Sequence, residues 1–220
     1  MRVSLGLAPA RRHEAPRAAE AGWWRLAYPW GFAEEVSRAA AREGRAASWL
    51  LSFIRKESAF APRARSPAQA LGLMQLLPKT AQAIAAWAPP EAPPEALIEG
   101  LPEALPEALY DPGTNVLLGA RYLRALGARY HEQLPLVALA YNAGPAALGG
   151  WLRAAREEQG LARLDLFVER VPFKEARGYV KRVAQGVCLY ELLYGELSLN
   201  ACAGRLPLSL TLEAREGVGF

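Results

Sequence analysis

Helical periodicity, interrupted at intervals by proline and glycine, constrains this chain more than any other feature of its sequence. From residue 31 onward, apolar side chains recur three and four positions apart, as in helices that bury one face. Apart from the short run SLTL near the C-terminus, no stretch alternates apolar and polar residues as a half-buried strand does. Alanine, leucine, arginine and glutamate are frequent, and all four cost little in a helix. The sequence therefore predicts an all-α fold.

Prolines and capping residues predict where the helices begin and end. Pro78 and Pro135 stand where a first helical turn tolerates proline, and Asp111 before a proline is a typical helix start. Ser48 is expected to cap the helix that follows it, and a linking stretch is expected around Trp151. The helices are predicted over residues 32–42, 49–60, 78–87, 112–127, 135–143 and 173–194.

The length of 220 residues suits one domain with a hydrophobic core and some appendages. We place this domain at residues 28–197, after a partly disordered extension at 1–27 and before a tail at 198–220. Residues 88–110 nearly repeat Pro-Glu-Ala-Leu and are predicted as a surface insertion, because prolines at this density prevent one long helix. An aromatic cluster at the start of the domain is expected to pack as an arm, with a platform for sugars as the alternative: Trp23, Trp24, Leu26, Tyr28 and Trp30.

Charge and hydropathy argue against several classes of protein. The formal net charge of +4 fits a solvated surface, although an anionic polymer such as nucleic acid or cell wall would also suit it. The arginines are scattered, so a nucleic-acid binder is not expected. No run approaches the ~20 apolar residues of a membrane span. The first 22 residues are arginine-rich without an apolar core, so either the protein is not exported by a standard signal or the chain is a fragment.

The two cysteines, Cys188 and Cys202, form no cluster with histidine that would hold a metal. No metal site is therefore expected. One disulfide between them is left open by the sequence, and a buried free thiol at Cys188 is the favoured interpretation.

A glutamate on an apolar helix face is the first candidate for chemistry. Leu50, Phe53 and Ile54 form a core-facing stripe, and the next position of that stripe is Glu57. An ionised carboxylate there is costly unless it is paired. Three interpretations remain open from burial alone, namely a buried ion pair, a face that opens onto a solvent cleft, and a general acid whose pKa is raised by desolvation.

Five blocks in a fixed order complete the pattern. They are IRKESAF at 54–60, SPAQALGLMQLLP at 66–78, DPGTNVLLGARYL at 111–123, ALAYNAGP at 138–145 and FVERVPFKEARGYV at 167–180. Together they resemble the catalytic domain of the soluble lytic transglycosylases, the Slt type, over roughly residues 28–195. The resemblance implies a fold similar to goose-type lysozyme. The chain departs from the family at Gln69, where a glycine is usual, and at Ala176, where threonine is frequent.

The resemblance also implies roles for individual residues. Glu57 is expected to be the single catalytic acid/base, with no metal or cofactor. The cleft around it is expected to bind the glycan through Ser58, Met74, Gln75, Tyr141, Asn142, Glu169 and Tyr179. Met74 is as well explained by the core. The alternatives for Glu169 and Glu175 are a helix-start charge or a partner of Arg177, and pairing with Arg177 is favoured for Glu175.

The implied activity is that of a peptidoglycan lytic transglycosylase of cell wall turnover. Such an enzyme cleaves the β-1,4 bond between N-acetylmuramic acid and N-acetylglucosamine and leaves a 1,6-anhydro sugar. One carboxyl group suffices because the sugar's own hydroxyl is the nucleophile, whereas ordinary glycoside hydrolysis uses two carboxylates. A lysozyme-type muramidase and a non-catalytic glycan-binding module are the alternatives, and a carboxylate across the cleft would favour the muramidase. The substrate implies a periplasmic or cell-envelope location, and the sequence leaves the oligomeric state open.

Overall fold

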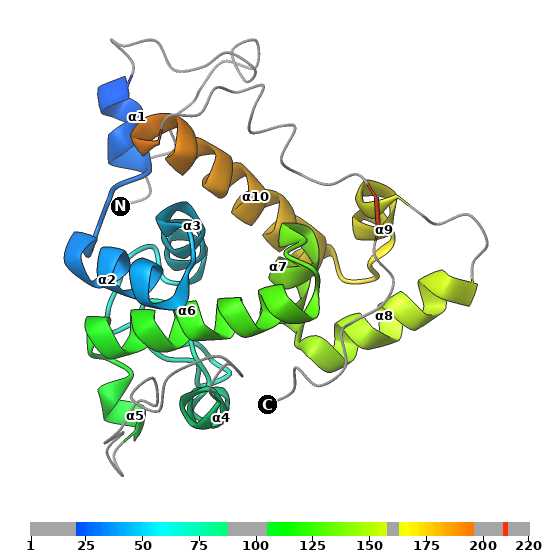
Figure 1. Cartoon of the computed structure of the whole chain (residues 1–220), viewed down its shortest axis with the longest axis horizontal. Coiled ribbons are helices and arrows are strands. Elements are labelled where there is room, and N and C mark those ends of the chain that lie inside the picture. Colours follow the sequence, from blue (N-terminus) through cyan, green and yellow to red (C-terminus); the bar gives the residue numbers. More distant parts are fainter. Residues whose placement is uncertain (1–20, 88–104, 158–162, 196–208, 211–220) are drawn as a thin grey trace.

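The computed structural model describes residues 21–87, 105–157, 163–195 and 209–210, and these form helices, turns and isolated β-bridges (Figure 1). The prediction of an all-α fold is confirmed. The described helices are α1 (Ala21–Ala27), α2 (Ala33–Glu43), α3 (Ala47–Glu57), α4 (Pro78–Ala86), α5 (Leu105–Ala108), α6 (Pro112–Arg129), α7 (Leu134–Ala143), α8 (Pro145–Glu157), α9 (Leu164–Arg170) and α10 (Lys174–Tyr194).

Helix α3 lies at the centre of the fold. Figure 1 views it nearly end-on, enclosed by α2, α6, α7 and α10. Its middle is apolar on every side, and Leu50, Leu51, Phe53 and Ile54 are completely buried. A helix that is apolar all round belongs in a core. The burial ends at the last turn, where charged residues replace the apolar ones and Glu57 closes the helix.

Helices α3 and α10 approach each other closely at one glycine. A Cβ atom on Gly186 would lie 2.2 Å from the Ser52 hydroxyl oxygen, which no real packing allows. The Ser52 hydroxyl donates a hydrogen bond to the Val183 carbonyl at 2.8 Å, so the serine is fixed as well as close. This contact sets the distance between α3, which ends at Glu57, and α10.

The loop between α3 and α4 is fastened to α6 by one buried amide. Asn115 accepts from the Met74 backbone N–H at 2.8 Å and donates to the carbonyls of Leu71 and Leu109 at 3.0 and 2.8 Å. Gly72 makes this possible, because its φ is +77° and a Cβ there would lie 2.2 Å from the Asn115 amide nitrogen. The loop is therefore a fixed wall.

Most predicted helix boundaries agree with the structure to within a residue or two. Gly44 ends α2 in the left-handed conformation, and Asp111 caps α6 by accepting from the Thr114 N–H at 2.8 Å. The prediction for Ser48 is wrong, since α3 begins at Ala47 and the Ser48 hydroxyl donates to the Glu191 carboxylate. The same helix stops at Glu57 rather than near Phe60, which has a positive φ.

The expected linking stretch around Trp151 is wrong. Residues Pro145–Glu157 form α8, with Leu148, Leu152 and Ala155 buried on one face. This stripe outweighs the helix-weakening glycines at positions 149 and 150, which lie near the Arg153 side chain. The helical periodicity of the sequence does not predict the short helix α9 either.

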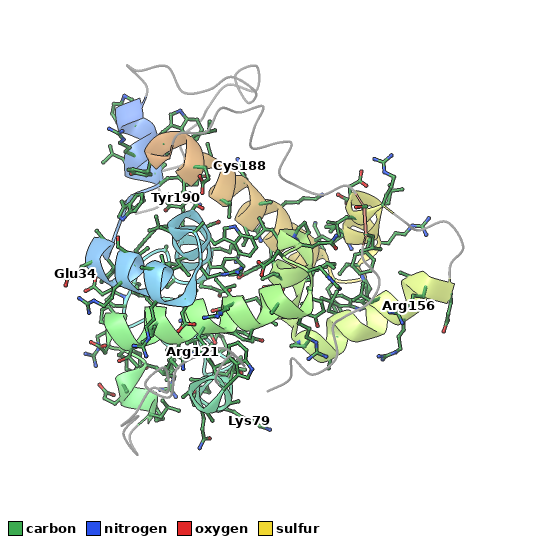
Figure 2. All side chains as sticks on the ribbon, viewed as in Figure 1. Glu34, Lys79, Arg121, Arg156, Cys188 and Tyr190 are labelled. Atoms are coloured by element: carbon green, nitrogen blue, oxygen red, sulfur yellow. The ribbon has the colours of Figure 1, made fainter. Side chains whose placement is uncertain are left out.

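The aromatic arm packs onto the C-terminal half of α10, where Figure 2 labels Tyr190. The Tyr28 ring is buried and meets the Tyr190 ring edge-on at 5.6 Å, and the Arg55 guanidinium lies 4.0 Å above it. Trp23 and Leu26 project into solvent, with 67% and 74% of their surface exposed. The arm prediction is thus confirmed for Tyr28, while the exposed indole of Trp23 leaves the sugar-platform alternative open.

The expectation of a free thiol at Cys188 is wrong. The side chain, labelled on α10 in Figure 2, is half-buried and is in a disulfide bond. The other cysteine of the sequence, Cys202, lies outside the described residues. So do residues 1–20, most of the predicted insertion at 88–110 and most of the tail. Of the helices that the structure describes, none combines the length and apolar character needed to cross a bilayer.

Replacing Gly186 with alanine should destabilise the fold by about 1–3 kcal/mol, because the added methyl group overpacks the α3–α10 contact. Urea unfolding followed by circular dichroism measures this change. The matched control is Gly150→Ala in α8, where a Cβ meets nothing closer than the end of the Arg153 side chain at 3.9 Å. That change should stabilise by roughly 0.5–1 kcal/mol. Equal effects of the two substitutions would contradict the close contact.

Candidate active site

A cleft of about 490 Å³ opens at the end of α3 where Glu57 lies. Its walls come from the α3–α4 loop, α4, α6, the end of α7 and the first turns of α8 and α10, and the Glu57 side chain is half-buried in it. The residues that line it are Glu57, Ser66, Ala68, Ala70, Gln75, Leu76, Leu77, Thr80, Tyr122, Tyr141, Asn142, Ala143, Gly144, Pro145 and Glu175.

One strong contact positions the glutamate. The Tyr179 hydroxyl on α10 donates a hydrogen bond to Glu57 Oε1 at 2.5 Å. Tyr179 is itself buried, with the Lys56 ammonium 4.9 Å above its ring. Among the described residues Glu57 forms no ion pair, in contrast to the buried Glu43, which pairs with Arg121 at 3.1 Å. The buried-ion-pair interpretation of Glu57 is therefore excluded for the described part of the chain.

Burial raises the pKa of the Glu57 carboxyl above its usual 4.5. Desolvation is the largest cause, and the nearby charge of Glu175 acts in the same direction. The hydrogen bond from Tyr179 and the charge of Lys56 oppose it by lowering the pKa. Because desolvation outweighs both, the pKa of Glu57 lies above that of an ordinary glutamate, which is the direction that a general acid requires.

An aromatic wall stands beside this carboxyl. The Phe53 ring meets the Tyr141 ring edge-on at 4.9 Å, and Tyr122 lies 5.0 Å from Tyr141 on the other side. The Tyr141 hydroxyl donates to the Met74 carbonyl at 2.8 Å. Desolvation, with the charge of Glu57 next in size, raises the pKa of Tyr141 well above 10, so its hydroxyl stays neutral. The same two causes act on Tyr179, which remains a donor to Glu57.

The structure brings Gln75, Tyr141 and Asn142 to the cleft with Glu57, as the sequence predicts. The Gln75 backbone has a φ of +50°, and its amide donates to the carbonyls of Ala64 and Gly72, so its side chain is locked along the wall. Asn142 is exposed and lines the cleft. Gln69, which departs from the family pattern, has a φ of +65°, a conformation for which glycine is better suited.

Met74 and Ser58 lie next to the cleft without lining it. The Met74 side chain is fully buried and fills the space over Gly119, where a Cβ would meet its sulfur at 2.1 Å. Met74 is therefore a core residue that supports the wall from behind. Ser58 follows the last residue of α3, and its hydroxyl donates to the Ile54 carbonyl at 3.2 Å.

Two glutamates are found in places that the sequence did not predict. Glu169 on α9 is exposed and pairs with Lys181 at 2.6 Å, and it is not among the cleft residues. Glu175 lines the cleft, whereas Arg177, its expected partner, donates to the Val171 carbonyl at 2.5 Å. The spacing from Glu175 to Tyr179 on one helix could have revealed this, because residues four apart share a face.

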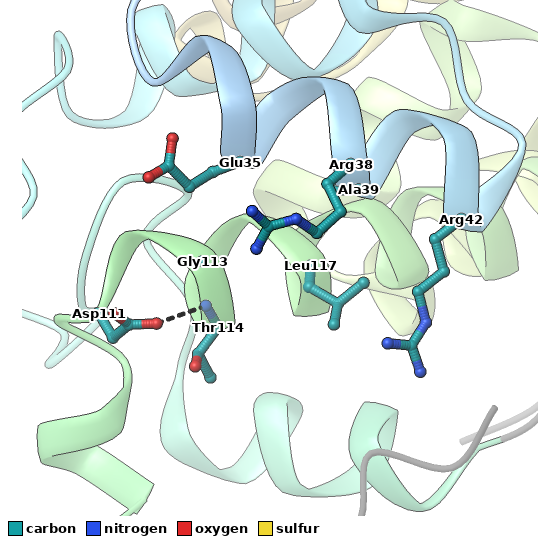
Figure 3. Close-up of a pocket in the computed structure, with 8 residues that line it drawn as sticks. All are labelled: Glu35, Arg38, Ala39, Arg42, Asp111, Gly113, Thr114 and Leu117. Atoms are coloured by element: carbon teal, nitrogen blue, oxygen red, sulfur yellow. Dashed lines mark hydrogen bonds between the residues drawn. The ribbon is translucent and has the colours of Figure 1, made fainter. Parts of the chain in front are cut away.

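A second hollow of about 350 Å³ lies between α2 and α6 (Figure 3). Arg38 and Arg42 reach over it from α2, and Asp111 closes it at the start of α6, where its carboxylate is engaged by the Thr114 N–H. It shares no lining residue with the cleft that contains Glu57. Glu57 and its cleft are therefore the candidate active site.

Fold and cleft together define a lysozyme-like helical domain, with the desolvated carboxyl of Glu57 beside an aromatic wall. The profile of the family described as the Transglycosylase SLT domain matches residues 34–163, more than half of the sequence. The chain therefore belongs to the transglycosylase SLT domain family.

Relatives and solved structures agree with this membership. A candidate soluble lytic murein transglycosylase of Haemophilus influenzae is 37% identical over 146 residues, which cover 66% of this chain and 22% of that protein. The 70 kDa soluble lytic transglycosylase of Escherichia coli is 29% identical, with a TM-score of 0.69, covering 83% of this chain and 28% of the other. An inactive mutant of the lytic transglycosylase Slt from Pseudomonas aeruginosa is 31% identical, with a TM-score of 0.62, covering 76% and 25%. The chain thus spans between about a fifth and just over a quarter of these relatives' length.

Replacing Tyr179 with phenylalanine should raise the pKa of Glu57 further, because the lost hydrogen bond is one that lowers it. Carboxyl carbon chemical shifts across a pH titration measure the pKa, with Glu57→Gln assigning the signal. Tyr190→Phe is the control, since the Tyr190 hydroxyl donates to the Pro29 carbonyl and not to the site. An unchanged or lower Glu57 pKa in the Tyr179 variant would contradict the contact.

Proposed function

We propose that this chain is the catalytic domain of a peptidoglycan lytic transglycosylase with Glu57 as its acid and base. The observation that carries the proposal is the desolvated carboxyl of Glu57, which meets the Tyr179 hydroxyl at 2.5 Å in a cleft of an SLT-family domain. Desolvation and the hydrogen bond from Tyr179 suit Glu57 to general acid catalysis, in which a carboxyl must be protonated at working pH. The Pseudomonas relative is described as inactive in a mutant form, which shows that single side chains matter in that protein.

The reaction proceeds in two proton transfers. Protonated Glu57 gives its proton to the glycosidic oxygen between N-acetylmuramic acid and N-acetylglucosamine, and the bond from the muramyl C1 to that oxygen breaks. Positive charge develops at C1 and is stabilised by the sugar's acetamido oxygen or by dipoles of the cleft. The C6 hydroxyl of the same sugar then attacks C1 and loses its proton to ionised Glu57. The products are a 1,6-anhydromuramyl end and a free N-acetylglucosamine hydroxyl, and Glu57 is protonated again.

The neighbours of Glu57 take supporting parts in this proposal. Tyr179 orients the carboxyl and stabilises its ionised form between the two transfers. Asn142 offers its amide group to the sugar, Gln75 offers its amide oxygen, and Tyr141 gives the cleft wall an aromatic surface. Ser58, Met74 and Glu169 act indirectly if they act at all in binding, since none of them lines the cleft.

A second candidate function is hydrolysis by a lysozyme-type mechanism, and Glu175 is the observation that favours it. This exposed carboxylate lines the same cleft as Glu57 and raises its pKa. A second carboxylate in a glycan cleft is what a water-activating base requires. Family membership favours cyclisation, and the chemistry of the released end distinguishes the two.

The cell envelope is the location that fits this substrate. The disulfide at Cys188 supports it, because disulfides persist in oxidising compartments such as the periplasm. The disulfide and the substrate thus both favour a location outside the cytoplasm.

Mass spectrometry of fragments released from purified peptidoglycan tests the activity. Anhydromuramyl ends are expected from the unaltered chain, and Glu57→Gln should lower their release by about 10²–10⁴-fold, because the acid is lost with little change in shape. Leu166→Ala, at an exposed apolar position of α9 outside the cleft lining, is the control and should keep most of the activity. Glycan binding without any product from the unaltered chain would instead support a non-catalytic binding module.

Replacing Glu175 with glutamine separates the two reactions. If Glu57 alone acts as acid and base, Glu175→Gln retains anhydromuramyl products within about tenfold of the unaltered rate. It should also lower the pKa of Glu57 and shift the alkaline limit of activity to lower pH, because a charge that raises this pKa is removed. Reducing ends from the unaltered chain that disappear in Glu175→Gln would make the domain a hydrolase.

A further inference from the structure

Two aromatic side chains lie together just beyond the described cleft. The ring of Trp151 on α8 is 5.9 Å from the ring of Phe173, centre to centre, with the planes inclined by 47°. Phe173 immediately precedes α10 and has 61% of its surface exposed, while Trp151 is half-buried against the core. We refer to Trp151 and Phe173 as the aromatic shelf.

Trp151 and Phe173 each stand close in sequence to a residue that lines the cleft. Helix α8 begins at Pro145, a cleft residue, and Trp151 follows on the same helix about 9 Å along its axis, at 1.5 Å per residue. Phe173 stands two positions before Glu175, another cleft residue. Figure 1 shows α8 leaving the end of α7 on the side of the molecule where α10 begins.

The backbone that presents Phe173 is fixed. Arg177 reaches back from the first turns of α10 and donates to the Val171 carbonyl at 2.5 Å, and Val171 is buried. Phe173 accordingly projects from an anchored turn, with the Trp151 ring as its described aromatic neighbour. A single exposed phenylalanine is ordinary on a protein surface. Its pairing with a tryptophan, on elements whose neighbouring residues line the cleft, indicates a binding surface.

We propose that the aromatic shelf is an additional glycan subsite, which stacks against a sugar ring beyond the two sugars at the scissile bond. This inference rests on the proposed function, since the glycan strand at Glu57 must leave the cleft along its rim. The C–H face of a pyranose ring is apolar and flat, and burying it on aromatic rings is favourable without any charged partner. A peptide stem carries carboxylates and would call for a cationic cradle, whereas the contact that defines the shelf is between two uncharged rings.

Binding without turnover tests the shelf. The parent protein is Glu57→Gln, and the ligand is glycan strands freed of peptide, with affinity measured by calorimetry. Phe173→Ala in this parent should weaken binding about five- to tenfold, as expected for one lost aromatic contact. Phe173→Tyr, which keeps the ring, should restore it. Phe173 is preferred to Trp151 for the test because its exposure makes a folding defect improbable.

Leu166→Ala is the control, because this exposed leucine of α9 belongs neither to the cleft lining nor to the aromatic shelf. Equal affinity in Phe173→Ala and the parent, or an equal loss in Leu166→Ala, overturns the proposal. So does a parent that binds no peptide-free strand, or a loss seen only with peptide-bearing strands. If the shelf variant loses affinity while the unaltered chain forms no anhydromuramyl product, the subsite stands and the proposed reaction fails.

Discussion

The close approach of α3 and α10 at Ser52 and Gly186 is the contact on which the site depends. Glu57 closes α3 five residues after Ser52, and Tyr179 precedes Gly186 by about two helical turns. With no side chain at Gly186, the helices lie near enough for the Tyr179 hydroxyl to reach Glu57 at 2.5 Å. A wider separation would leave the carboxyl facing water and the tyrosine hydroxyl buried without its partner, which costs free energy.

The same packing makes it costly to ionise the carboxyl group of Glu57, because the charge is desolvated. Glu57 ends a helix whose middle residues, from Leu50 to Ile54, are buried, and the desolvation of its charge outweighs the help of Tyr179 and Lys56. A structural glutamate avoids this cost by pairing, as Glu43 does with Arg121 at 3.1 Å. Glu57 is instead left able to hold a proton. Such local destabilisation is typical of functional sites, where stability and activity are in conflict.

The sequence predicts this architecture where one local signal dominates, and fails where two compete. Asp111 before proline fixes the start of α6, and Glu57 stands out because it interrupts an apolar stripe. Ser48 has a capping side chain, yet it lies inside α3 because Glu191 of a distant helix accepts its hydrogen bond. The disulfide of Cys188 depends on a long-range pairing that no local pattern reports.

The cleft itself was predicted only in part, because its members come from six separate stretches of chain. Gln75, Tyr141 and Asn142 are found by their motifs, whereas Glu175 was assigned to Arg177 and Met74 was left between core and cleft. Which face of a helix meets a cleft is decided by packing against other helices. Asn115, which ties the cleft loop to α6, makes its three hydrogen bonds to residues that only the folded chain brings near.

The free energy of unfolding as a function of pH, for the unaltered chain and for Glu57→Gln, tests most directly whether desolvation governs this site. A folded-state pKa above 4.5 means that the native state binds more protons than the unfolded state between those two values. The stability of the unaltered chain therefore falls, relative to the variant, as pH rises through that window. We predict that Glu57→Gln is the more stable protein at neutral pH and that its advantage disappears below pH 4.5. An unaltered chain that is the more stable at neutral pH would show that Tyr179 and Lys56 outweigh burial, and would contradict the account.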